Sequence, residues 1–484
     1  MKATVTNLFV HFIYVSLFSF GLFVSTYCAA AEVKNYQNQL AVIDKAHQEF
    51  TNDFYNKIIK TAKLKAARFN SLEALSQAII NEINLKKPIK ATALIIRNQF
   101  LLTRNYYDPK VILLIKQLLD NNVLINAQDL ISKINDQGDD GVNAQLSYLL
   151  ADFYFQRKNW PKVLTYLKDN MSELPIEQYH HAQLMTGISL QKQGEHHRSI
   201  KAYEKVVASS EYYAAAQFNM ALANIRQGWW TDGHQIISQL LTSQETENKE
   251  KALNRLYITL GYSLLNQAYY RNARKTFQLV GLNSRYSNQA LLGIALTAAH
   301  QDDYIGALNA TRFLKDKKQD DLPIDEAYLL MPFFYEKSQQ LATASLGYSQ
   351  ASGYYQDKIN SMNRLINSPL ILKKATMAMS ENSVMSIANA NSDANNKTRV
   401  DFLANYPKYF FSQRQNMLAF KDSLTRLNKP QISKKITALN DEYENITIMM
   451  AKSIMQNRVS QLSSYLNQSR YGLARLYDNN TVEQ

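Results

Sequence analysis

Cysteine is nearly absent from this sequence of 484 residues, and glycine and proline are scarce. The one cysteine is Cys28, and the chain holds 14 glycines and nine prolines. A single cysteine excludes an intrachain disulfide framework and the cysteine-rich metal sites. Because compact sheets need frequent tight turns, the scarcity of glycine and proline favours an almost wholly helical chain, and no β pattern of any length is evident.

The familiar catalytic motifs are also missing. The sequence contains no Gly-rich phosphate loop, no dinucleotide fingerprint, no HExxH and no GxSxG. The nearest approach to a metal site is a pair of histidine doublets, His180 with His181 and His196 with His197. Adjacent residues of a helix point about 100 degrees apart, so neither doublet is a natural chelate. The sequence therefore predicts no enzyme, no bound metal and no cofactor.

What the sequence does contain is one pattern that recurs six times between residues 143 and 357, at a spacing of roughly 34 to 37 residues. An apolar residue and a small one are followed by a large residue, an aromatic after a turn, a small residue and another aromatic. The fourth copy is the clearest, with Leu260, Gly261, Leu264, Tyr270, Ala273, Phe277 and Val280. Small residues let two helices approach closely, and stacked hairpins complete one another's core.

This pattern resembles the tetratricopeptide repeat (TPR), over about 215 of the 484 residues. The resemblance implies an all-α fold, a TPR-like α-solenoid of about six helical hairpins in residues 143–357. Extra N-terminal helices and a C-terminal helical hairpin are expected outside the repeats. The alternative is a non-repetitive helical bundle in which aromatic and small residues recur without repeats.

Residues 1–31 have the layout of a secretory signal peptide. Lys2 precedes an apolar run from Leu8 to Val24, and small residues end the segment at Ala31. The sequence thus predicts an exported, periplasmic protein. Two alternatives remain, which are an uncleaved membrane anchor and lipidation at Cys28, although the bulk of Tyr27 argues against lipidation.

Residues 32–142 carry helical patterning without the repeat signature. The apolar side chains that share one helix face there are Leu40, Ile43, Ala46, Phe50 and Phe54. This N-terminal region is expected to be either a set of degenerate repeats or a capping domain, since the terminal units of a solenoid are often atypical.

Residues 380–397 are rich in Asn and Ser and predict a flexible linker, because they carry too little apolar mass to pack. The region 398–478 beyond it predicts two coiled-coil-like helices, at about 399–427 and 431–478. The second helix carries an apolar seam, formed by Ile436, Leu439, Tyr443, Ile446, Met450, Leu462, Leu466, Leu473 and Leu476. A hairpin that folds on itself or back onto the solenoid explains the seam, and formation of a homo-oligomer is the alternative.

The chain is basic, with a formal net charge of +13. Its basic residues are scattered rather than gathered in one stripe, and an exported chain meets little nucleic acid, so no nucleic-acid partner is expected. Association with a membrane surface, an acidic glycan or an acidic protein through this charge is the alternative function, as in a peripheral adhesion factor.

The family resemblance implies that ligands contact the first helices of the repeats, on the concave face. Carried over to this sequence, the predicted partner-binding residues are Tyr148, Phe155, Leu184, Ile188, Phe218, Leu222, Ile258, Tyr262, Leu292, Leu296, Leu329 and Phe333, with a basic rim at Lys192, Arg226 and Arg255. Such an apolar groove would hold an amphipathic helix of a partner or this chain's own C-terminal helices, or it would be plain core. The predicted function is a non-catalytic scaffold for protein partners in the bacterial cell envelope.

Overall fold

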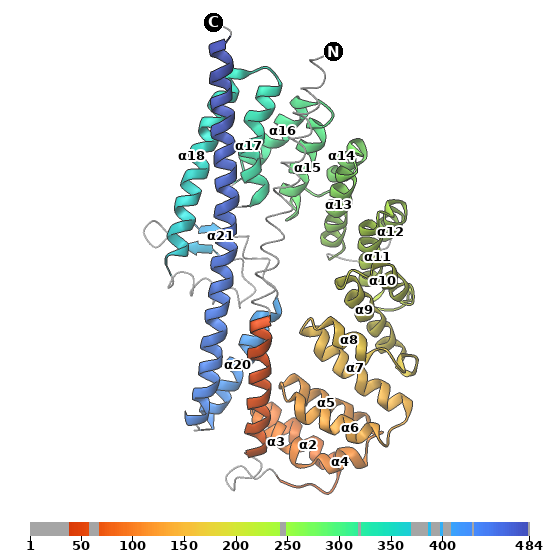
Figure 1. The fold of residues 1–484 in the computed structure, drawn as a ribbon. Coiled ribbons are helices and arrows are strands. Elements are labelled where there is room, and N and C mark those ends of the chain that lie inside the picture. The colour runs from red at the N-terminus through yellow and green to blue at the C-terminus, as the bar shows by residue number, and fades with distance from the viewer. Residues whose placement is uncertain are drawn as a thin grey trace. The chain divides into compact units, whose positions relative to one another are not determined.

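The computed structural model describes residues 38–57, 67–242, 248–317, 321–368, 386–388, 397–399, 408–427 and 430–482. Nearly all of these residues are helical, which confirms the predicted fold class (Figure 1). The predicted signal peptide at 1–31 lies outside the described residues, as does most of the predicted linker at 380–397. Inside that segment, β1 (Ser386–Ala388) pairs antiparallel with β2 (Lys397–Arg399), which begins at the last residue of the predicted linker, and Ile387 lies opposite Thr398.

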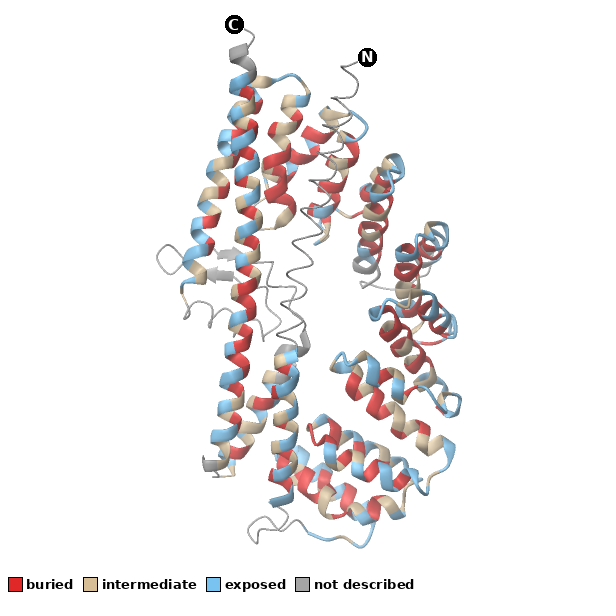
Figure 2. Ribbon diagram, viewed as in Figure 1, coloured by how far each residue is buried: buried red, intermediate tan, exposed pale blue. Residues whose placement is uncertain are grey.

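The chain divides into two compact units. Unit 1 comprises Met1–Asp44, Ile294–Gln415 and Thr437–Gln484, and unit 2 comprises Lys45–Gly293 and Asn416–Ile436. In each unit the buried residues lie mainly on the sides of helices that face neighbouring helices (Figure 2).

Unit 2 consists mainly of helical hairpins that follow one another along the chain. A helix at residues 38–57, part of which lies in unit 2, comes first. The helices that follow are α2 (Leu72–Asn84), α3 (Pro88–Arg97), α4 (Gln99–Arg104), α5 (Pro109–Asp120), α6 (Leu124–Asn135), α7 (Asp140–Gln156), α8 (Trp160–Tyr166), η2 (Met171–Glu173), α9 (Ile176–Lys192), α10 (His196–Tyr203), α11 (Tyr213–Gln227), α12 (Trp230–Thr242), α13 (Asn248–Asn266) and α14 (Tyr270–Gln278).

Helix α15 (Ser287–Ala299) begins in unit 2 and ends in unit 1. Unit 1 continues with α16 (Tyr304–Lys315), α17 (Leu322–Lys337) and α18 (Leu341–Ile366). The C-terminal helices α20 (Lys408–Arg426) and α21 (Pro430–Val482) each contribute residues to both units.

One residue in the turn of each hairpin adopts the left-handed backbone conformation. These residues are Lys86, Asn122, Lys158, Gly194, Gly228, Ala268, Asp302 and Gln339, with φ between 54° and 87°. In each turn the next backbone N–H bonds to the carbonyl five residues earlier, as from Glu195 to Leu190 at 3.0 Å. This Schellman closure ends the first helix and redirects the chain into the second. The hairpins α2/α3 and α5/α6 close in the same way as the six predicted repeats, so the repeat geometry begins before residue 143.

A large aromatic side chain from each of several second helices packs against small residues of first helices. Phe277 of α14 lies between Gly261 of α13 and Gly293 of α15, and a Cβ on Gly261 would stand 2.5 Å from its ring. Tyr203 of α10 meets Gly187 of α9 in the same way. These glycines are needed because any side chain there would displace a buried ring.

In unit 1, α21 packs on the last hairpin, which is α17/α18. Tyr348 of α18 contacts Gly472 of α21, where a Cβ would stand 2.7 Å from the ring. Gly472 therefore contacts the Tyr348 ring in the same way as Gly293, on the first helix of the following hairpin, contacts the Phe277 ring. The surrounding cluster joins both segments and includes Leu329, Ala344, Tyr355, Ile359, Leu462, Leu466 and Leu476. In unit 1, α21 acts as a cap that replaces a further first helix.

A network of charges holds this cap in place. The carboxylate of Asp325 on α17 is fully buried and accepts hydrogen bonds from Arg458 of α21, from Lys358 Nζ at 2.5 Å and from Tyr354 Oη at 2.5 Å. Arg475 Nη2 of α21 lies 2.6 Å from Glu336 Oε1 of α17. Because ions are costly to bury without partners, this pairing fixes the register of α21 on α17.

The C-terminal region departs from its predicted boundaries. The first helix begins at Lys408 rather than at 399, and residue 399 belongs to β2. The second begins at Pro430, which suits the first position of a helix because proline has no N–H to leave unpaired. Leu462, Leu466 and Leu476 of the predicted seam are buried in the cap, so this part of the seam folds back onto the last repeat.

The left-handed turns predict opposite effects of two substitutions in unit 2. Gly194→Ala should lower the free energy of unfolding by about 1 kcal/mol, because a Cβ is strained at this φ. Nothing lies within 4 Å of a Cβ at Gly194, so the effect is a pure backbone effect. Ala268→Gly should be neutral or stabilising, since it relieves the same strain. Chemical denaturation measures both, and equal destabilisation by the two variants would contradict the left-handed assignment.

The charge network predicts that Arg458→Met loosens the cap. The change leaves the Asp325 carboxylate buried with one cation fewer, which should cost about 3 kcal/mol of stability. Arg470→Met, on an exposed face of the same helix, should change stability by less than about 0.5 kcal/mol. Hydrogen exchange of α21 amides, measured beside chemical denaturation, localises the loss. Adding Asp325→Asn to Arg458→Met should restore part of the stability, and a further loss would argue against the ion pair as the cause.

Candidate partner-binding face

The predicted partner-binding residues are not equally available. Of the apolar set, Leu184, Leu222, Ile258, Leu292 and Leu329 are buried, each with at most 9% of its surface exposed. The others are partly buried, namely Tyr148, Phe155, Ile188, Phe218, Tyr262, Leu296 and Phe333. The basic residues Lys192, Arg226 and Arg255 are exposed. These five leucine and isoleucine residues thus pack in the repeat core, and the accessible part of the predicted set consists of the other seven residues and the basic rim.

In unit 2 the first helices α7, α9 and α11 bring together polar aromatic side chains. Tyr148 Oη and His181 Nδ1 are hydrogen-bonded at 2.7 Å, and the His181 ring stacks on Tyr212 with centroids 4.6 Å apart. Burial lowers the pKa of His181, although the negative charges of Asp152 and Glu211 oppose the shift. The imidazole is therefore held neutral and acts as a hydrogen-bonding group rather than a cation.

A groove lies between the adjacent first helices α11 and α13. It encloses about 300 Å³ and is lined by Ile225, Arg226, Ile258, Thr259, Tyr262, Ser263 and Asn266. Tyr262 donates its hydroxyl to the Gln289 carbonyl at 2.9 Å, and its ring packs on Phe277 with centroids 4.9 Å apart. The Tyr262 side chain is thus a fixed wall of the groove.

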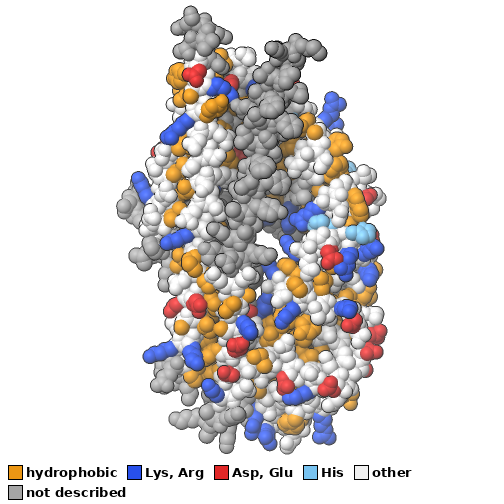
Figure 3. Space-filling view, viewed as in Figure 1, with side chains coloured by type: hydrophobic (Ala, Val, Ile, Leu, Met, Phe, Trp, Pro, Cys, Tyr) orange, Lys and Arg blue, Asp and Glu red, His pale blue; other side chains and the backbone are white. Residues whose placement is uncertain are grey.

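Cations accompany the partly buried aromatic residues on these first helices. The Arg255 guanidinium lies over the Phe218 ring, 5.5 Å from its centroid, and in unit 1 Lys337 lies 5.5 Å from the Phe333 centroid. Over the whole visible surface, by contrast, Lys and Arg are interspersed with Asp and Glu (Figure 3). This agrees with the scattered pattern of basic residues in the sequence.

In unit 1 one predicted contact position is filled by the chain itself. Leu329 of α17 packs in one cluster with Leu462 and Leu466 of α21. Of the two occupants considered for the groove, the chain's own C-terminal helix therefore contacts this position of the last repeat.

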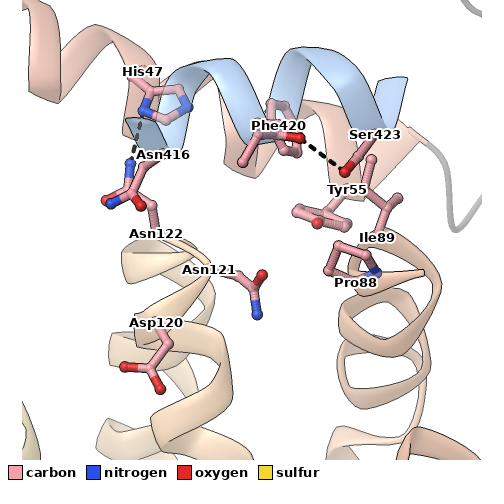
Figure 4. Close-up of a pocket in the computed structure, with 11 residues that line it drawn as sticks. His47, Tyr55, Pro88, Ile89, Asp120, Asn121, Asn122, Asn416, Phe420 and Ser423 are labelled. Carbon is pink, nitrogen blue, oxygen red and sulfur yellow. Dashed lines mark hydrogen bonds between the residues drawn. The ribbon is translucent and has the colours of Figure 1, made fainter. Parts of the chain in front are cut away.

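Sequence reasoning missed a second cavity in unit 2, of about 100 Å³, between α20 and the N-terminal hairpins (Figure 4). Arg157 Nη2 donates to Asn122 Oδ1 at 2.9 Å, which directs the Asn122 amide nitrogen to His47 Nδ1 at 3.0 Å. His47 Nε2 is buried without a protein partner. Phe420 of α20 packs edge-on against His47 with centroids 6.0 Å apart. The one residue that could have indicated this site is His47, whose polar side chain is buried. The apolar pattern of its helix gives no sign of that burial.

The histidine doublets are not gathered into a site. His180 is buried, His181 and His196 are partly buried, and His197 is exposed beside Trp229, with centroids 5.9 Å apart. Among the described residues, no group of three or more His, Cys, Asp or Glu side chains is placed to hold a metal ion. Within the same part of the chain, no helix combines the length and apolar character that crossing a membrane requires.

No family model matches the chain, and no curated protein matches it. Among solved structures, the apo form of RapI is 14% identical, with a TM-score of 0.40, over 77% of this chain and 97% of that chain. The TPR domain of P58(IPK) is 12% identical, with a TM-score of 0.21, over 63% of this chain and 93% of that one. The APC/C hetero-tetramer Cut9–Hcn1 is 11% identical, with a TM-score of 0.26, over 83% and 96% of the two chains. The assignment of a TPR-like solenoid rests on the hairpins and turns of the chain itself.

The buried histidine predicts a pH dependence of stability in unit 2. Burial, followed by the charge of Arg157, lowers the pKa of His47 from 6.5 to about 4. Between these values the unfolded chain binds a proton that the folded chain does not, so stability falls as the pH falls from 6.5 to 4. The loss should approach about 3 kcal/mol.

Denaturation curves across this pH range measure the effect. His47→Gln should flatten the pH dependence, whereas His197→Gln, at an exposed position, should leave it as it is in the wild type. An unchanged slope in His47→Gln would assign the acid sensitivity to other groups.

Proposed function

We propose that this chain is an exported, non-catalytic scaffold of the bacterial cell envelope that binds a protein partner through the first helices of its repeats. The observation that carries the proposal is the groove between α11 and α13, with a basic side chain at its edge and a fixed aromatic wall. Protein interfaces are enriched in arginine and aromatic side chains of this kind. The layout of residues 1–31 supports export.

The architecture supports binding more than catalysis. Among the titratable groups of the first helices, Tyr148 is hydrogen-bonded to His181, and Lys192 is exposed. A nucleophile beside a base that is itself oriented by a third group is what most hydrolytic mechanisms require. A stacked array of hairpins instead offers an extended surface for a partner.

Charge substitutions separate a contact surface from core. Tyr148→Glu, Phe218→Glu, Tyr262→Glu and Phe333→Glu are expected to weaken capture of the partner while each variant stays folded, with the larger fall in unfolding midpoint at Tyr148 and Tyr262, whose hydroxyls form internal hydrogen bonds. Leu282→Glu and Val207→Glu, at exposed positions away from the first helices of unit 2, are matched controls. Unfolding of the four variants would assign these residues to core and remove the proposed face.

Capture is measured in intact cells with a crosslinker that does not cross the inner membrane, followed by identification of the crosslinked protein. Such a reagent reaches the chain only if the chain has been exported. A defined partner that is crosslinked to the wild type and to the controls, but not to the four variants, supports the scaffold. Binding to anionic vesicles that salt abolishes, with no protein partner, would favour the adhesion function instead.

A further inference from the structure

Three cations from successive repeats of unit 2 lie exposed on the first helices. Lys192 is the last residue of α9, Arg226 lies in the last turn of α11, and Arg255 lies on α13. We call these three residues the basic ladder. In the part of the chain that the structure describes, none of them forms an ion pair with a carboxylate.

The ladder residues act on one another as like charges. Lys192 is exposed but partly desolvated by its neighbours, which lowers its pKa, and the charges of Arg226 and Arg255 lower the pKa further. Arg226 is affected in the same way, by burial and then by Arg255. Lys158, in the turn of the preceding hairpin, has its pKa lowered by burial and by Lys192. The positive potential therefore extends along consecutive repeats.

Helix geometry explains only part of this arrangement. Cations are favourable near helix C-termini because they face the negative end of the helix dipole, and this accounts for Lys192 and Arg226. Arg255 lies far from the end of α13 at Asn266, so the dipole does not apply to it, and its guanidinium lies instead over the Phe218 ring of α11, 5.5 Å from the centroid. An anion supplied from outside would reduce the repulsion among all three.

The groove between α11 and α13 adjoins the ladder, because Arg226 belongs to both. Ile225, Ile258 and Tyr262 give the groove apolar walls, and Ser263 and Asn266 add polar groups. Its volume of about 300 Å³ lies at the lower end of the range for ligand pockets and leaves room for an apolar side chain. The site therefore combines a row of positive charges with one apolar recess.

We propose that the basic ladder and this groove bind an acidic segment of a partner protein, with carboxylates paired to Lys192, Arg226 and Arg255 and one apolar side chain in the groove. The inference rests on the proposed scaffold function and names the chemistry of its partner. Exposed carboxylate–cation pairs are individually weak, so the apolar anchor fixes the register of the segment, and the ladder selects for acidic sequence.

An acidic protein segment fits the site better than a nucleic acid does. Single-stranded nucleic acid needs aromatic faces on which bases stack. The aromatic ring of the groove is Tyr262, which is tied to the Gln289 carbonyl and packs on Phe277. A phosphate backbone would pair with the ladder but leave the groove without its apolar occupant.

The test uses the full chain without its first 31 residues and a labelled peptide in which glutamates flank a central leucine. A triple variant, with Lys192, Arg226 and Arg255 each changed to Gln, is compared with a control triple at Lys110, Lys116 and Lys133. The controls remove the same charge from exposed lysines of unit 2 that pair with their own carboxylates. Fluorescence anisotropy measures binding, and circular dichroism checks that each variant folds.

The ladder variant is expected to bind the peptide about tenfold or more weakly than the wild type, because each exposed pair contributes up to about 1 kcal/mol. The control triple should bind within about twofold of the wild type, since its charges lie away from the groove. Changing the central leucine to serine should weaken binding to the wild type. An equal loss of peptide affinity in the two triple variants would mean that binding depends only on net charge and not on this site. If oligouridylate bound more tightly than the peptide and lost affinity in the ladder variant, the assignment of a protein partner would be overturned.

The outcome is separable from that of the scaffold function. If the ladder variant still captures the crosslinked envelope partner as the wild type does, the acidic-segment inference fails while the scaffold stands. If the peptide binds through the ladder but no partner is captured from cells, the binding of acidic segments is supported and the proposed scaffold function in the envelope is rejected.

Discussion

The packing of one large side chain against helix backbones sets the spacing of the hairpins, and the rest of the structure depends on it. Phe277 occupies the space between Gly261 and Gly293, so α13 and α15 are held one ring apart. Tyr203 does the same against Gly187. Because a hairpin cannot bury its apolar face alone, each ring ties its own hairpin to a neighbour. The groove lies one repeat earlier, between the first helices α11 and α13.

The residues that made the fold predictable are those with a strict spatial role. Gly261, Ala273 and Phe277 recur because close helix approach and ring packing tolerate few alternatives, so their period is visible in the sequence. The left-handed turns are less visible. Gly194 and Gly228 mark two of them, but the other turns close without glycine, including the turn at Ala268 in the clearest repeat and those at Lys86 and Asn122 in the N-terminal hairpins.

The candidate site was harder to predict than the fold. Position within a repeat does not determine exposure, so Leu184 and Phe218 occupy the same repeat position yet differ in burial. The cap was also hidden, because the contact of Gly472 with Tyr348 joins segments far apart in the chain. The ladder residues Lys192 and Arg226 were predicted from the repeat register, but their lack of carboxylate partners is a property of the folded chain.

Charge is handled in contrasting ways in the two units. In unit 1, Asp325 is buried and matched by Arg458 and Lys358, so its charge serves the packing of one helix on another. In unit 2, the charges of the basic ladder are exposed and face like charges. Charges of the first kind fix a structure and are internally satisfied. Charges of the second kind leave electrostatic free energy to be gained when an anion binds, which is what recognition requires.

The cap also bears on how the array of hairpins ends. A solenoid whose last hairpin is open exposes an apolar surface that a neighbouring repeat would normally cover. Gly472 and its neighbours on α21 cover that surface at the α17/α18 end. The array of hairpins thus ends, on this side, against a helix encoded in the same chain.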